Sequence, residues 1–170
     1  MQRNIFFLYV FFSTFAFSQE STIDFTLKNI ENDEIVFSEH LGNGPIYISF
    51  WALWCEPCKA EMKILQKLFE KYHEDGLTVF AINRDTPKSL AKVKAYVSSQ
   101  EYSVPILLDP NAEVFEKFSG QAIPYSVLLD AKGNIIKTRT GFLPGDEKHI
   151  EDDIVKLLPE KKSENEEEAH

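Results

Sequence analysis

The two cysteines of the sequence, Cys55 and Cys58, are separated by two residues. An apolar run at residues 46–51, typical of a buried strand, precedes them, and apolar residues at three- and four-residue steps follow. The pair therefore lies where a strand leads into a helix, and Pro57 suits the first helical turn. Cys55 lies at the very start of this helix, so we expect it to be the more exposed thiol. Because a helix start stabilises a thiolate, we also expect its pKa to lie below the free value of about 8.5.

Three kinds of site use cysteines at this spacing. A structural disulfide commonly closes a large loop, and closing a two-residue gap constrains the unfolded chain very little. A zinc site normally needs four ligands, and the sequence has neither a second cysteine pair nor a paired histidine motif. We therefore interpret the cysteines as a redox pair, in which Cys55 attacks a disulfide and Cys58 resolves the mixed disulfide.

The stretch Phe-Trp-Ala-Leu-Trp-Cys-Glu-Pro-Cys at residues 50–58 resembles the thioredoxin superfamily, in particular the extracytoplasmic thiol-disulfide oxidoreductases of the TlpA/ResA type. The dithiol motif with its aromatic lead-in is specific, whereas the rest of residues 20–158 matches by pattern only. The resemblance implies an enzyme that reduces cysteine-containing exported client proteins, as in cytochrome c assembly. It also implies a membrane-bound thiol reductant as electron donor, and no cofactor.

The same resemblance gives roles to residues beyond the motif. It implies a cis bond at Pro124, facing the dithiol and exposing the backbone of Ile123 to an extended substrate segment; an ordinary trans proline is the alternative. It places Glu61, three residues after Cys58 on the same helix face, near the dithiol as a proton carrier. Thioredoxins proper often have a buried aspartate where this chain has Ser49, so Glu61 is the remaining candidate base for Cys58. The alternative is a solvated helix glutamate.

The helix after the dithiol departs from the resemblance at one position. Lys63 stands where relatives have a helix-kinking proline, which predicts a straighter helix. We expect Trp54, Glu56 and Pro57 to contribute to the surface that contacts the substrate. The Glu56 carboxylate also destabilises a nearby thiolate and so tunes the reduction potential. The histidines have no ligand spacing, and we predict no metal site.

The length of 170 residues predicts one domain, which we assign to residues 19–158. Residues 1–18 combine a positive start at Arg3, an apolar run and small residues, which predicts a cleaved signal peptide and a periplasmic or extracellular location. An uncleaved membrane anchor is the alternative. Residues 159–170 predict a disordered acidic tail. The excess of 27 acidic over 18 basic side chains argues against nucleic-acid binding, and we expect a monomer.

Strands alternate with helices along the chain, which predicts an α/β, thioredoxin-like fold with a central mixed sheet flanked by helices. We expect an added N-terminal β-hairpin, a C-terminal hairpin that forms an antiparallel edge, and an insert around residues 83–105. The predicted strands are 23–27, 34–37, 46–51, 77–83, 104–108, 125–129 and 135–139. The predicted helices are 57–74, 88–99, 112–118, which Gly120 closes, and 146–158.

Two other functions compete with the reductase. A peroxiredoxin-like thiol peroxidase shares the fold, but its reactive cysteine follows a Pro-x-x-x-Thr-x-x pattern, whereas Ala52 and residues 49–51 precede Cys55. A non-catalytic copper carrier spaces its cysteines by three residues and adds a distal histidine, and neither feature is present. Both are disfavoured.

Overall fold

The computed structural model describes residues 23–160. The predicted signal peptide at 1–18 and residues 161–170 of the predicted acidic tail lie outside the described residues. Within the described part of the chain, no helix is long and apolar enough to cross a membrane.

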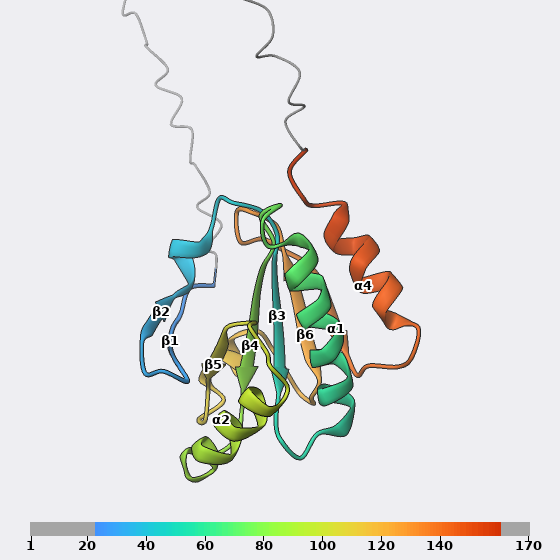
Figure 1. Ribbon diagram of the computed structural model, residues 1–170. Helices are drawn as coiled ribbons and strands as arrows, with labels where there is room; N and C mark the ends of the chain where they lie inside the picture. Colours follow the sequence, from blue (N-terminus) through green and yellow to red (C-terminus); the bar gives the residue numbers. More distant parts are fainter. Residues whose placement is uncertain (1–22, 161–170) are drawn as a thin grey trace, which may run out of the picture.

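A seven-stranded mixed sheet forms the centre of the described chain, in the order β2-β1-β5-β4-β3-β6-β7 (Figure 1). The strands β3, β4 and β5 are parallel, while β6 runs antiparallel to β3 and pairs with β7. The predicted N-terminal hairpin is present, and its strand β1 joins the sheet antiparallel to β5. The strands are β1 Thr26–Asn29, β2 Glu34–Val36, β3 Ile46–Trp51, β4 Thr78–Asn83, β5 Ile106–Leu108, β6 Tyr125–Leu129 and β7 Ile135–Thr140.

Helices cover both faces of this sheet. The longest, α1 (Glu56–Tyr72), begins directly after the carboxyl end of β3 and runs back along the sheet, with α4 (Asp146–Val155) beside it (Figure 1). The predicted insert contains a short 3-10 helix, Pro87–Ser89, followed by α2 (Leu90–Ser99). The opposite face is covered by α3 (Glu113–Lys117) and the 3-10 helix Phe37–His40.

Alternation along β3 divides the core into two. Ile46, Ile48 and Phe50 face an aromatic cluster that includes side chains of α3 and the N-terminal segment. Tyr47 and Trp51 face α1, α2 and α4, in the cluster that also contains both cysteines. All six residues of the strand are buried, which explains why the run is almost entirely apolar.

Most predicted boundaries differ from the structure by one to three residues, and four of the differences have a local cause. The first strand spans Thr26–Asn29 rather than 23–27, and it extends to Asn29 because this residue closes the hairpin by bonding to Asp33 through backbone and side chain. The strand predicted at 104–108 starts at Ile106, after Pro105, which has no N–H for a ladder bond. The last helix ends at Val155 instead of residue 158, since Pro159 disfavours helical backbone at the residue before it.

The fourth difference concerns the end of α3. The helix stops at Lys117 rather than residue 118, and Ser119 takes the left-handed conformation, with φ of 59°. Gly120 closes the helix as predicted, because its N–H donates to the Phe115 carbonyl oxygen at 2.9 Å. A glycine is required at this position, because a Cβ atom there would lie 2.3 Å from the Phe115 ring. The glycine therefore permits a close approach in the aromatic core.

Phe37 ties the added hairpin to that core, and its replacement tests this role. The side chain is 1% exposed and stacks on Phe25 with ring centroids 5.0 Å apart. Phe37→Ala should lower the free energy of unfolding by about 3–5 kcal/mol, because it leaves a cavity. Urea denaturation measures the change, and Leu143→Ala, at a side chain that is 70% exposed, is the control. Equal effects of the two substitutions would contradict the assignment.

Candidate active site

The two cysteines form a disulfide at the start of α1. Their sulfurs are 2.02 Å apart and their Cα atoms 5.2 Å apart. Cys55 is the N-cap residue of α1, its Sγ accepts a hydrogen bond from the Cys58 N–H at 3.3 Å, and proline occupies the first turn. Cys55 is 4% exposed and Cys58 is fully buried, so the expected order of exposure is confirmed. A thiolate at Cys55 would meet the unpaired N–H groups of the helix start.

Asp85 holds the loop that leads into the dithiol. Its Oδ2 atom accepts hydrogen bonds from the Leu53 N–H at 2.8 Å and from Asn83 Nδ2 at 2.9 Å. Asn83 is buried at the carboxyl end of β4, so the loop before Cys55 is fastened to the neighbouring strand. Sequence reasoning missed this pair. The polar residues that directly follow a buried strand were the available signal.

Glu61 lies three residues after Cys58 on α1 and is 1% exposed, which excludes the solvated alternative. Its Oε2 atom accepts a hydrogen bond from Ser49 Oγ at 2.7 Å, and its Oε1 atom accepts one from the Tyr47 hydroxyl at 3.2 Å. Ser49 stands where thioredoxins proper often have a buried aspartate. It contacts Glu61, the residue that we expected to act as the base for Cys58 in place of that aspartate.

Tyr47 and Ser126 extend this network, and sequence reasoning did not identify either. The Tyr47 hydroxyl is also hydrogen-bonded to Ser126 Oγ at 2.9 Å. Both residues are buried in central strands, and Ser126 lies directly opposite Ser49 in the β3–β6 pairing. Each of the two apolar strand segments contains a hydroxyl side chain. Because buried polar groups need hydrogen-bond partners, these hydroxyl groups were the signal that could have predicted the contact.

Burial controls the ionisation of this network. It raises the pKa of Glu61 to about 7, while hydrogen bonding from Ser49, Tyr47 and Ser126 acts in the opposite direction. Burial, and then the adjacent Glu61 charge, hold the pKa of Tyr47 well above its ordinary value. Glu61 can therefore gain and lose a proton near neutral pH, whereas Tyr47 remains a neutral phenol.

The predicted substrate-contacting residues surround the motif. Trp54 is 72% exposed, and Glu56 and Pro57 are exposed, while Trp51 is fully buried. The peptide bond between Ile123 and Pro124 is cis, as the resemblance implies. Ile123 is half-buried and packs against the cluster that contains both cysteines.

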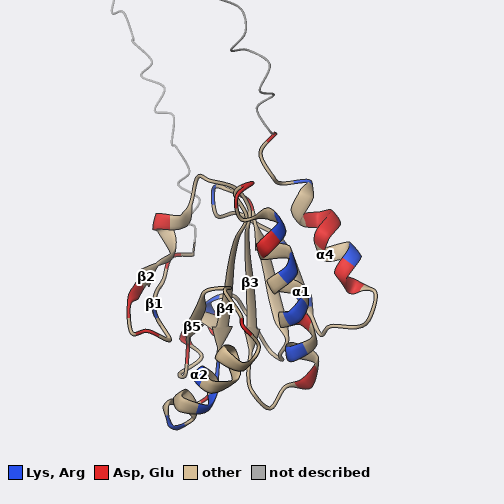
Figure 2. Cartoon of the chain, in the orientation of Figure 1, with Lys and Arg blue, Asp and Glu red and all other residues tan. Residues whose placement is uncertain are grey.

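Charges around the motif come mainly from α1. Glu56 forms an ion pair with Lys59 at 2.8 Å, and lysines recur along the exposed side of this helix (Figure 2). Residues 56–72 form one continuous helix, with Lys63 where a kink would occur in relatives. Among residues 23–160, no three His, Cys, Asp or Glu side chains are grouped so that they could hold a metal ion.

The raised pKa of Glu61 makes stability depend on pH. The folded state holds this proton up to about pH 7, whereas the ordinary pKa of a glutamate side chain is 4.5, so the free energy of unfolding should fall as pH rises between these values. Relative to Glu61→Gln, which cannot ionise, the native protein should lose about 3 kcal/mol over this interval. Urea denaturation of both proteins across the interval measures the difference. Parallel pH profiles would contradict the burial of an ionisable Glu61.

Comparison with known proteins gives a consistent result. The thiol-disulfide oxidoreductase ResA of Halalkalibacterium halodurans is 29% identical over 158 residues, covering 89% of this chain and 87% of that protein. StoA from Bacillus subtilis matches the structure with a TM-score of 0.63 at 25% identity, over 78% of this chain and 96% of that one.

A second solved structure, described as a candidate thiol:disulfide interchange protein DsbE from Chlorobium tepidum, has the same fold. Its TM-score is 0.73 at 24% identity, over 79% of this chain and 93% of that one. The thioredoxin-like fold, the Cys55–Cys58 disulfide and the ResA relative place the chain among the thiol-disulfide oxidoreductases. The AhpC/TSA family model matches residues 19–138, and the chain therefore belongs to the AhpC/TSA family.

Proposed function

We propose that the protein is an exported reductase that cleaves disulfides in cysteine-containing client proteins outside the cytoplasm. The observation that carries the proposal is the arrangement at the start of α1. There, Cys55 caps the helix, Cys58 is buried behind it, and a buried carboxyl group with a pKa near 7 lies on the same helix. Such a site separates an attacking thiol from a resolving thiol and supplies a base for the second.

The reaction proceeds in two exchanges. The Cys55 thiolate attacks one sulfur of the client disulfide, so that a mixed disulfide forms and the other client sulfur leaves as a thiolate. Glu61 then accepts the proton of Cys58, and the Cys58 sulfur attacks Cys55 Sγ. The second client sulfur leaves, which makes the client a dithiol and the protein the Cys55–Cys58 disulfide. Two electrons have moved from the protein to the client.

The surroundings of the dithiol support a polypeptide substrate. Exposed Trp54 and Pro57 lie on either side of Cys55 in the sequence, and Ile123 precedes a buried cis proline. We propose that an extended client segment contacts these residues and the backbone of Ile123. Export rests on the predicted signal peptide at residues 1–18, and a membrane-bound thiol reductant would restore the dithiol. Clients in cytochrome c assembly fit this role.

Cysteine substitution tests the order of the two exchanges. Cys58→Ser should accumulate mixed disulfides with clients, because Cys55 can attack but nothing releases it. Cys55→Ser, the matched variant, should trap almost none, since the remaining thiol is buried. A non-reducing gel of extracytoplasmic extracts, followed by mass spectrometry of the adducts, measures both. Equal trapping by the two variants would contradict the assigned roles.

The reduction potential tests the direction of electron flow. Glu56 and Pro57 contain no group that specially stabilises a thiolate, and a less stable thiolate makes the potential more negative. We expect a value of roughly −220 mV or lower, on the side of thioredoxin. Equilibration with glutathione or dithiothreitol, read from tryptophan fluorescence, gives the number. A value near −120 mV, together with efficient oxidation of an unfolded dithiol client, would identify a disulfide donor instead.

A further inference from the structure

The proposed function leaves a proton in the interior. Glu61, which is 1% exposed, takes it from Cys58, which is fully buried. While the mixed disulfide exists, the client covers the entrance above Cys55. Above its pKa of about 7, Glu61 must pass this proton to solvent before it can act as a base again. Because Glu61 is buried, the proton needs a path through the side chains that contact it.

A chain of hydroxyl groups leads away from the carboxyl group. Glu61 Oε1 lies 3.2 Å from the Tyr47 hydroxyl, which lies 2.9 Å from Ser126 Oγ. A phenol has one proton, so when Tyr47 donates to Glu61 it can accept from Ser126. Both hydroxyl groups can thus accept one proton while they donate another, without either becoming an ion.

A small cavity begins where this chain ends. It is lined by Tyr47, Ser126, Leu128, Lys137, Arg139, Ile150 and Asp153, and its volume is about 10 Å³. This is close to the smallest space that admits one water molecule, and the polar lining supplies hydrogen-bond partners for it. The cavity lies between the sheet and α4, and Tyr47 lines it while Glu61 does not.

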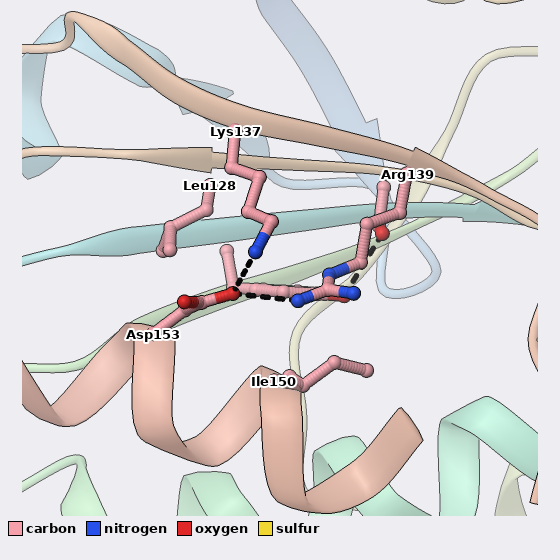
Figure 3. Close-up of a pocket in the computed structure, with 7 residues that line it drawn as sticks. Leu128, Lys137, Arg139, Ile150 and Asp153 are labelled. Atoms are coloured by element: carbon pink, nitrogen blue, oxygen red, sulfur yellow. Dashed lines mark hydrogen bonds and ion pairs between the residues drawn. The ribbon is translucent and has the colours of Figure 1, made fainter. Parts of the chain in front are cut away.

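The outer wall of the cavity reaches solvent through charged side chains. Lys137 and Arg139 extend from β7 to Asp153 on α4, which accepts a hydrogen bond of 2.6 Å from each (Figure 3). The side chains of Lys137, Arg139 and Asp153 are 44%, 23% and 19% exposed. A water molecule at this position would therefore have a short path to bulk solvent.

We propose that Tyr47, Ser126 and this cavity form a proton path between Glu61 and solvent, separate from the surface that the client covers. Glu61 passes its proton to the Tyr47 oxygen, the Tyr47 proton moves to Ser126, and the Ser126 proton moves to water in the cavity. One proton leaves, and each hydroxyl group ends with one proton. Tyr47 and Ser126 touch no reacting sulfur in this scheme, so they act as relay residues.

The charged groups around the path are compatible with this transfer. Asp153 offsets one of the two β7 cations at the cavity, and Lys156 lies 3.6 Å from its other oxygen, largely in solvent. On the inner side, Asp146 of α4 raises the pKa of Glu61, while Arg139 acts on Tyr47 in the lowering direction. The phenol nevertheless remains neutral, because burial and the Glu61 charge have the larger effect.

The test measures proton transfer directly in the oxidised protein, without a client. A light-triggered pH jump from above to below the Glu61 pKa protonates the carboxyl group. Time-resolved infrared absorption follows this event, with the Glu61 band identified by its loss in Glu61→Gln. In Tyr47→Phe and Ser126→Ala, protonation should slow at least about tenfold. Ser126→Thr, which keeps a hydroxyl group, should restore the rate.

Ser49→Ala is the matched control, because Ser49 donates to the other oxygen of the same carboxyl group and does not line the cavity. This variant should move the titration midpoint of Glu61 to higher pH and leave the protonation rate close to native. Native rates in both Tyr47→Phe and Ser126→Ala would overturn the path, as would an equal slowing in Ser49→Ala. Because no client is used, a failed path leaves the reductase proposal intact, and the trapping experiment tests that proposal separately.

Discussion

The burial of one carboxyl group constrains the whole α1 side of the sheet. Glu61 lies in an otherwise apolar layer, and an unpaired carboxylate there would be costly. Its two oxygens therefore need donors, and β3 provides them through Tyr47 and Ser49, which alternate to the same face. Both strand residues depend on the register that pairs β3 with β6. A shift of one residue would turn the hydroxyl groups to the aromatic face and leave the carboxyl group without partners.

The two faces of the sheet consequently have different roles in the structure. On the aromatic side, Phe50 packs edge-to-face on Phe115 of α3, within a cluster of rings that anchors the strands. The α1 side contains the disulfide, Glu61 and the hydroxyl network within a cluster of aliphatic side chains. Rigid strands shared by the two faces hold the network in place, so the reactive side can contain buried polar groups that a smaller core would not tolerate.

Local pattern was sufficient for some of these features and insufficient for others. The dithiol, the strand before it and the helix after it are neighbours in sequence, so spacing alone predicted them. The Tyr47–Ser126 contact joins residues 79 positions apart, and it exists only after the strands pair. The Asp85 contact to Leu53 likewise depends on the parallel pairing of β3 and β4. At α4, apolar Leu157 and Leu158 prolonged the helical pattern, yet they pack against the core from the turn that precedes Pro159.

Proton and electron transfer are coupled through this same layer. The Cys55 thiolate and the Glu61 carboxylate would be two anions joined by one short stretch of helix, and like charges oppose each other's ionisation. Reduction of the disulfide therefore favours the protonated form of Glu61, and protonation of Glu61 favours the thiolate. When two ionisable groups interact in this way, the apparent pKa values describe the coupled pair and not either residue alone. A carboxyl group with a pKa near 7 in the disulfide form thus makes the affinity of the site for electrons follow the pH of its surroundings.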